Sequence, residues 1–220
     1  RFIGQTLIKS ILTLLLKNFK TAREEGADSN DWCKLSLYIM LMKAGPYCGY
    51  SLDEIIKIKQ KEEKKCGKFF WGYSGVFCRP YVVQNFVTQA LNNNEEPTLL
   101  FTETKSLFTA DKVDKFSKYS TDKSKWLELP KEVLLVGNKS RPHFAITAKS
   151  LKKVDKTLDL SDYCVLRGMV ADKDNYLDTY FKYRVDKACA VYSPRGDSIE
   201  KEIEISYSCV LTEPYGVYVR

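Results

Sequence analysis

The sequence predicts an α+β fold in which a helical N-terminal half packs on a mainly antiparallel β-sheet formed by the C-terminal half. Before about residue 95, apolar residues recur at three- and four-residue steps, the period of helices that bury one face. After Pro97, segments typical of strands follow one another without βαβ alternation. We therefore expect a helical region over residues 1–95 and a β-rich region with one helix over residues 96–220, which together can form a single domain.

The segment over residues 3–19 predicts an amphipathic helix that ends near Gly26. Its apolar run is shorter than the roughly 20 residues that cross a bilayer, and Lys9 and Lys17 interrupt it, so we expect no membrane span. Basic flanks around a Leu-rich face also describe a membrane-surface helix. Packing against the rest of the chain or against a second copy explains the pattern more simply, so this helix is a candidate contact for a homo-oligomer.

Three further helices are predicted in the first half. One covers residues 31–44 and ends at Gly45-Pro46. Another follows the capping box that begins at Ser51 and has Glu54 at its third helical position. The last begins at Pro80, since Pro is favoured in the first helical turn, and ends at the Asn triplet before Pro97.

The second half predicts strands separated by turns. The clearest strand covers residues 203–211, where apolar residues alternate with Glu and Ser, as expected for one buried and one solvated face. Residues 133–136 and 143–148 are expected to pair as a hairpin with a six-residue loop. The other predicted elements are strands over 98–102, 163–170 and 217–219, a helix over 176–185, and a long loop or ribbon over 105–125.

The composition indicates a soluble, cytoplasmic protein. Seven widely spaced cysteines in a chain of 220 residues argue against a disulfide framework and for free thiols in a reducing compartment. They lack the close spacing of zinc ligands, so we expect neither a metal nor another cofactor. The net charge of +7 favours weak attraction to anions such as phosphate, nucleic acid or acidic proteins. Acidic residues interrupt nearly every lysine run, which argues against a dedicated duplex binder.

Four aromatic residues and three glycines crowd into the block over residues 66–80. In one interpretation this block is a loop whose rings fill the core. In the other it is a loop that faces a ligand, with Trp71 and Tyr73 as stacking platforms for a base or another planar group. The glycine spacing matches neither the dinucleotide fingerprint nor a P-loop.

Cys78, Arg79 and Pro80 stand at a predicted helix start. The helix dipole and Arg79 would stabilise a thiolate there, and a nucleophilic Cys78 would need His143, the single histidine, as its base. The same helix start could instead hold a phosphate beside Arg79, or Cys78 could be a buried apolar residue. Glu103, near a strand end, is the best single candidate for a catalytic acid.

Two other segments suit anions. The loop over residues 137–143 gathers Lys139, Arg141 and His143, which favours anion binding or, more simply, a solvated turn. Residues 105–126 interleave lysines with aromatic residues, as single-strand binders do. A solvated edge hairpin protected by lysines explains that segment equally simply.

We therefore expect a binding protein that recognises a nucleotide or a nucleic-acid segment through the 66–80 block and the 137–143 loop. The first alternative is a protein–protein inhibitor or adaptor directed at an acidic partner, of the kind that a virus encodes against a host complex. The second is a nucleotide-processing enzyme that uses Cys78, Glu103 or His143. The residues assigned to ligand binding are Trp71, Tyr73, Arg79, Lys139, Arg141 and His143.

Overall fold

The computed structural model describes residues 37–105, 114–137, 143–167, 170–181, 185–195 and 201–220. The chain divides into two compact units, residues 1–35 and residues 36–220. The predicted helix over residues 3–19, with its proposed role in a homo-oligomer, lies outside the described residues. All statements below concern the second unit.

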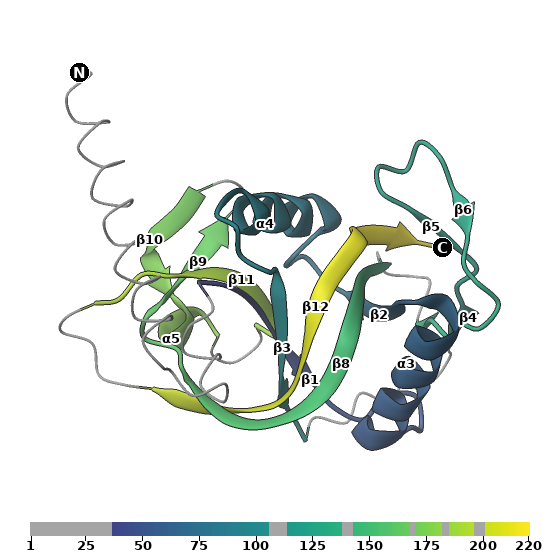
Figure 1. Cartoon of the computed structure of the whole chain (residues 1–220), viewed down its shortest axis with the longest axis horizontal. Helices are drawn as coiled ribbons and strands as arrows, with labels where there is room; N and C mark the ends of the chain where they lie inside the picture. The colour runs from purple at the N-terminus through teal and green to yellow at the C-terminus, as the bar shows by residue number, and fades with distance from the viewer. Residues whose placement is uncertain (1–36, 106–113, 138–142, 168–169, 182–184, 196–200) are drawn as a thin grey trace. The chain divides into compact units, whose positions relative to one another are not determined.

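A large mixed sheet dominates this unit, so the predicted fold class is wrong. The described part of the predicted helical region, residues 37–95, is not a helical layer; it contributes two strands, β1 and β2, to the same sheet as the strands after residue 96. The main path of the sheet is β10-β9-β11-β1-β3-β12-β5-β6, and β8 joins β12 to β2 (Figure 1). The elements are β1 Tyr38–Ala44, α3 Leu52–Cys66, β2 Phe69–Ser74, α4 Pro80–Asn92, β3 Thr98–Glu103, β4 Asp114–Lys115, β5 Lys118–Ser120, β6 Leu127–Glu128, β7 Val136–Gly137, β8 His143–Asp159, β9 Tyr163–Arg167, β10 Val170–Tyr176, α5 Leu177–Tyr180, β11 Lys187–Tyr192 and β12 Glu202–Val219.

Strand β1 occupies the second half of the helix predicted over residues 31–44, whose residues 31–36 lie outside the described part of the chain. It pairs in parallel with β3 and antiparallel with β11, so both of its edges are used. Met40 and its neighbours Ile39 and Leu41 are all fully buried. A strand covered on both faces appears in sequence as a continuous apolar run, and such a run cannot be distinguished from a buried helix by its period.

The aromatic block also forms a strand and not the predicted loop. Its residues 69–74 make β2, which pairs antiparallel with β8, so that Trp71 lies opposite Ile146. The flanking glycines have positive φ angles: Gly67 ends α3 at +72° and Gly75 turns the chain after β2 at +109°. The glycines therefore serve the ends of the strand, where left-handed backbone is needed, and the aromatic residues supply its β-propensity.

Helices α3 and α4 confirm the two start signals that the sequence contained. At the start of α3, the Ser51 N–H donates to Glu54 Oε2 (2.7 Å) and the Glu54 N–H donates to Ser51 Oγ (3.3 Å), which is the predicted capping box. Helix α4 begins with Pro80 in its first turn. Helix α3 contacts β2 and β8, and α4 contacts β12 and β11.

The longest pairing in the sheet joins β8 and β12, which curve through it side by side in Figure 1. The alternating segment over residues 203–211 is a strand, as predicted, and continues to Val219. The predicted hairpin between 133–136 and 143–148 is wrong, because β8 pairs with β2 and β12 while β7 pairs with β4. Short-range turn signals favoured the hairpin, but the distant aromatic strand β2 and the distant strand β12 supply better partners.

Two apolar clusters lie on opposite faces of β2. Phe69, Trp71 and Tyr73 join the cluster that also holds residues of α3 and α4. Phe70 points to the other side, into a smaller cluster with Phe116 and residues near the end of β12. This alternation follows from the two-residue period of a strand.

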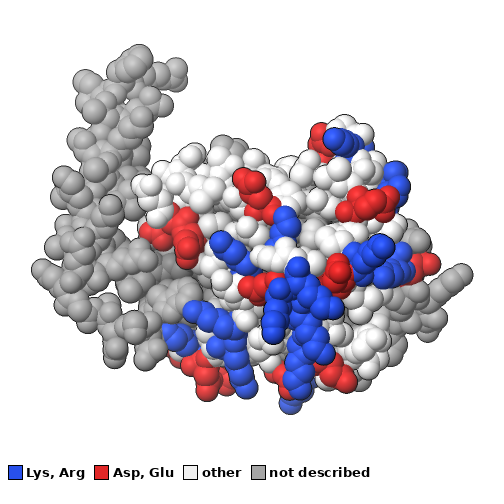
Figure 2. Space-filling view, turned by 45° about the vertical axis from the view of Figure 1, so that its right-hand side comes forward, with Lys and Arg blue, Asp and Glu red and all other residues white. Residues whose placement is uncertain are grey.

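In the described part of the chain, no helix is both long enough and apolar enough to cross a membrane. The face shown in Figure 2 carries a band of Lys and Arg side chains, with Asp and Glu side chains beside it.

Candidate ligand-binding pocket

The two rings assigned to ligand stacking are core residues. Trp71 and Tyr73 are each 8% exposed. Trp71 packs on Phe101, with ring centroids 4.5 Å apart, and Tyr73 packs on Phe144 at 5.6 Å. The Tyr73 hydroxyl donates to the Cys78 carbonyl oxygen, and burial raises the pKa of this phenol. These contacts favour the core interpretation of the aromatic block over the ligand-facing one.

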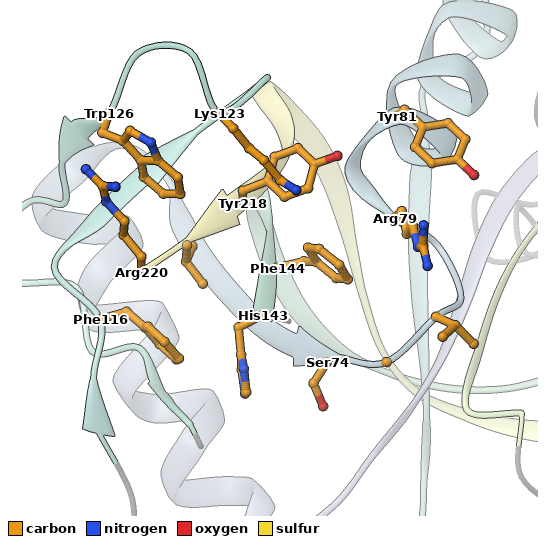
Figure 3. Close-up of a pocket in the computed structure, with 13 residues that line it drawn as sticks. Ser74, Arg79, Tyr81, Phe116, Lys123, Trp126, His143, Phe144, Tyr218 and Arg220 are labelled. Carbon is orange, nitrogen blue, oxygen red and sulfur yellow. The ribbon is translucent and has the colours of Figure 1, made fainter. Parts of the chain in front are cut away.

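A pocket of about 800 Å³ opens just beyond β2, at the end of the aromatic block. Its walls come from the turn after β2, the start of α4, the segment containing β5 and β6, the start of β8 and the end of β12. In Figure 3, Arg79 and Tyr81 stand on one side, and Trp126 and Arg220 stand on the other. Four parts of the sequence, within residues 74–81, 116–126, 143–144 and 218–220, therefore enclose a single space.

Three exposed cations border the pocket: Arg79, Lys123 and Arg220. Lys123 Nζ lies 4.5 Å from the centroid of the Tyr218 ring, and Arg220 Cζ lies 4.0 Å from the Trp126 ring. Cation–π contacts of this length hold a flexible side chain near an aromatic face without neutralising its charge. The described residues that line the pocket thus include these three cations and no acidic residue.

Aromatic rings also line the pocket beside these cations, and their exposure ranges from exposed to buried. Tyr81 is 55% exposed, and Trp126 and Tyr218 are half-buried. Phe144 is buried and meets Tyr218 edge-on, with centroids 5.6 Å apart. The pocket thus combines a rigid apolar floor with partly exposed rings whose faces are large enough to take a planar group.

The β5–β6 turn places Lys123 through a local hydrogen-bond network. Lys123 adopts a φ of +70°, and its N–H donates to Ser120 Oγ (2.9 Å). The Asp122 carboxylate accepts hydrogen bonds from the Ser124 hydroxyl and N–H, which lower the pKa of Asp122. Because Asp122 is occupied within the turn, the Lys123 ammonium extends over Tyr218 and not toward its acidic neighbour.

Close packing between α4 and β12 places Arg79. A methyl group at Gly216 would lie 2.9 Å from Val83 Cβ and 3.1 Å from the Pro80 carbonyl oxygen, so only glycine fits there. The first turn of α4 therefore sits directly on β12. Arg79, immediately before that turn and without a side-chain capping bond, extends to the pocket.

His143 forms part of the wall. Its ring packs on Phe116, with centroids 4.9 Å apart, and it lies opposite Ser74 in the β2–β8 register. A methyl group at Gly137 would lie 2.3 Å from His143 Nε2, so the absence of a side chain at Gly137 makes room for the imidazole.

The pocket contains Arg79 and His143, two of the six residues assigned to binding from the sequence. Trp71 and Tyr73 lie in the core cluster. Lys139 and Arg141 lie outside the described residues.

Sequence reasoning missed the cations and rings that the other segments contribute. Lys123 and Trp126 belong to the interleaved lysine–aromatic segment, so that pattern was a usable signal. Tyr81, Tyr218 and Arg220 had no local signal, because only the β12 and α4 packing brings them to the pocket.

Of the three candidate catalytic residues, His143 lines this pocket, and Cys78 and Glu103 do not. Cys78 is buried, with its Sγ 4.0 Å from Cys189 Sγ. The contact with Cys78, together with burial, raises the pKa of the Cys189 thiol. Glu103 is exposed at the end of β3. Within the described ranges, no group of His, Cys, Asp and Glu side chains is arranged to hold a metal ion.

No protein-family model, curated protein or solved structure matches this chain.

Proposed function

We propose that this protein binds a nucleotide or a single-stranded nucleic-acid segment in the pocket between α4 and the β5–β6 turn. The observation that carries the proposal is the pairing of cations with partly exposed rings around one space. Arg220 lies over Trp126 and Lys123 lies over Tyr218, and no acid lies among the described lining residues.

Each part of such a ligand has a matching group in the pocket. A base or nucleoside can stack on Trp126, Tyr218 or Tyr81, since aromatic side chains stack on bases of any sequence. Phosphate oxygens can accept hydrogen bonds from Arg79 and Arg220, whose planar guanidinium groups suit bidentate contacts. The volume of about 800 Å³ lies within the range of small-molecule sites, roughly 300–1,000 Å³.

The proposal keeps the ligand class expected from the sequence but changes the residues that contact the base. Tyr73 supports the pocket from within, because it packs on the floor residue Phe144, and Trp71 packs on Phe101 in the core. The stacking role passes to Tyr81, Trp126 and Tyr218.

The test compares two tryptophan substitutions. Trp126→Ala removes an exposed stacking surface and should weaken nucleotide binding about 5- to 150-fold, equivalent to roughly 1–3 kcal/mol per base. The melting temperature of the unliganded protein should change little, because Trp126 is only half-buried. Trp71→Ala is the contrasting variant: it leaves a cavity in the core and should cost roughly 3–5 kcal/mol of stability.

The measurement is a titration with nucleoside triphosphates and with short single-stranded oligonucleotides, followed by melting temperature and fluorescence. A ligand that binds the folded state raises the melting temperature in a concentration-dependent way. Full-strength binding by Trp126→Ala would contradict the assignment of the pocket, and no binding by the wild-type chain would contradict the function.

A protein partner is the second candidate, and the rim of the pocket gives it specific support. Val76 and Tyr81 are 65% and 55% exposed, and Leu127 lies exposed on β6. Exposed apolar and aromatic residues beside arginine are typical of interface hot spots. An acidic protein whose binding depends on Val76 and Tyr81, with no nucleotide effect on melting, would favour this candidate.

A further inference from the structure

Helix α3 carries four exposed lysines on one face, together with the exposed Glu54 of its first turn. Its exposed lysines Lys57, Lys61, Lys64 and Lys65 are spaced by one, three or four residues. At 100° per residue they fall within an arc of about 100°, so they share one face of the helix. From Lys57 to Lys65 this face extends for about 12 Å.

The acids at the start of α3 serve structural roles. Asp53 Oδ1 accepts a hydrogen bond from the Tyr207 hydroxyl on β12 (2.8 Å). Glu54 Oε2 accepts from the N–H and the hydroxyl of Ser51, at 2.7 and 2.8 Å. Both carboxylates are therefore committed to the protein's own donors.

The acids at the end of α3 are committed in the same way. Glu62 is buried, receives a 2.8 Å contact from Lys59 Nζ, and accepts from the Leu134 N–H (2.8 Å). Glu63 accepts from the Ser150 N–H on β8. Lys59 is itself buried and occupied by Glu62, so it belongs to this internal network and not to the exposed lysine face.

The exposed lysines of α3 take part in none of the ion pairs found among the described residues. Like charges three or four positions apart destabilise a helix slightly. The helix dipole favours Lys64 and Lys65 in the last turn, but it gives no such benefit to Lys57 and Lys61. Glu54, three positions before Lys57, attracts that lysine, so Lys61 is the exposed lysine of this helix that neither the dipole nor this pair explains.

Strand β8, which contacts α3 at another side of the helix, carries further exposed lysines. The hydrogen bond from the Ser150 N–H to Glu63 fixes this part of β8 beside the last turn of α3. Lys149 and Lys153 are exposed on either side of that contact. We call the exposed lysines 57, 61, 64, 65, 149 and 153 the lysine face.

Strand β2 connects the lysine face to the pocket. It begins two residues after Gly67, the C-cap of α3, and it ends at Ser74, which lines the pocket. Six residues of strand span about 20 Å. A single strand of several nucleotides can cover that distance, and single-strand sites commonly take about 4–16 nucleotides.

We infer that the ligand is a polynucleotide whose phosphate backbone continues from the pocket onto the lysine face; this inference rests on the proposed function and narrows it. Bases occupy the aromatic pocket, and the lysines neutralise the phosphates that follow. The described large apolar residues with high exposure, Tyr50, Val76, Tyr81, Leu91 and Leu127, all lie outside α3. The lysine face therefore lacks the apolar side of a membrane-binding helix and the aromatic anchors of a protein interface.

The test measures the salt dependence of binding to a 12-nucleotide single strand for the full chain. Lys61→Gln/Lys64→Gln should make the slope of log K against log salt shallower by about 1.4, because each lost phosphate contact on single strands contributes about 0.7. The control Lys105→Gln/Lys201→Gln removes the same charge from exposed positions outside the lysine face and should change the slope by less than half as much. Mononucleotide binding should be equal in both variants, since a mononucleotide fills only the pocket.

The outcomes separate this inference from the proposed function. If both double variants match the wild-type slope while Trp126→Ala still loses mononucleotide binding, the lysine face is not used and the pocket assignment stands. If Trp126→Ala binds mononucleotide and oligonucleotide normally, the proposed function fails, and the inference fails with it. Equal competition by polyglutamate or by phosphatidylserine vesicles would also overturn the inference, because the surface would then recognise negative charge and not a polynucleotide.

Discussion

The local environment of each residue decides whether its side chain is part of the core or is available to a ligand. Trp71 and Trp126 illustrate the difference, since one tryptophan lies in the core cluster and the other lines the pocket. Trp71 alternates inward on a strand and packs on Phe101, while Trp126 stays half-buried beneath Arg220. Their different environments follow from strand alternation and sheet pairing and not from residue type.

A residue-scale prediction concerns the space that Gly137 leaves for His143. Gly137→Ala would place a methyl group 2.3 Å from His143 Nε2 and 3.1 Å from Phe116 Cε2, so the imidazole must move. We expect a loss of stability of roughly 1–3 kcal/mol, the usual cost of overpacking.

A double-mutant cycle checks the cause. In a His143→Ala background the same Gly137→Ala change should cost less than half as much in urea unfolding, because the clashing ring is gone. An equal cost in both backgrounds would show that the strain arises elsewhere.

At the scale of elements, the sequence predicted where two helices begin, but it did not predict which strands pair with one another. The capping box of α3 and the Pro80 start of α4 are local patterns with local causes, and both are present in the structure. The apolar segment of β1 was predicted as a helix because its burial on both faces depends on β3 and β11, which lie some 60 and 150 residues later. A local sequence pattern cannot identify strand partners that are so far away along the chain.

The candidate site divides in the same way. Arg79 could be predicted because it precedes a recognisable helix start, and the lysine–aromatic segment around Trp126 was recognisable as a possible binding segment. Tyr218 could not be assigned to the site from the sequence. Its position on β12 shows no local binding signal, and its role depends on Lys123, which only the fold places over its ring.

An element-scale prediction concerns the pH dependence of the α3 cap. The Ser51 N–H, and then its hydroxyl, lower the pKa of Glu54. A carboxyl whose folded-state pKa lies below its unfolded value stabilises the fold above the unfolded pKa, about 4.3, and loses that contribution as pH falls through the folded pKa. The urea midpoint of Glu54→Gln should therefore lie below wild type at pH 7 and converge with it toward pH 3.

The matched control for the cap is Glu202→Gln, which removes an exposed carboxylate from the start of β12. Its difference from wild type should stay small over the same pH range. A pH-independent difference between Glu54→Gln and wild type would mean that the carboxylate contributes through its shape and not through its charge.

At the scale of the whole molecule, the described sheet and the pocket belong entirely to residues 36–220. Strands from both sides of residue 95 share this sheet. For example, β1, which precedes residue 95, pairs with β3, which follows it. The pocket is likewise built from segments that only the complete sheet brings together.

A molecule-scale prediction follows from this unit. Residues 36–220 expressed alone should unfold cooperatively in urea and should bind the same ligands as the full chain within about threefold. Sedimentation of the two forms also tests the predicted role of the N-terminal helix, since only the full chain should self-associate. A non-cooperative transition in the shorter chain would contradict the independence of the unit.

Strand β12 is hydrogen-bonded to β3, β5 and β8, yet it leaves the ribosome after every other strand of the described sheet. Until then, β3 and β8 each emerge with an edge that has no partner, and such edges recruit other chains. Closing contacts over such long separations is slow, which prolongs that exposure during translation. Premature termination before residue 202 should thus yield aggregated nascent chains and a strong requirement for chaperones in the cell.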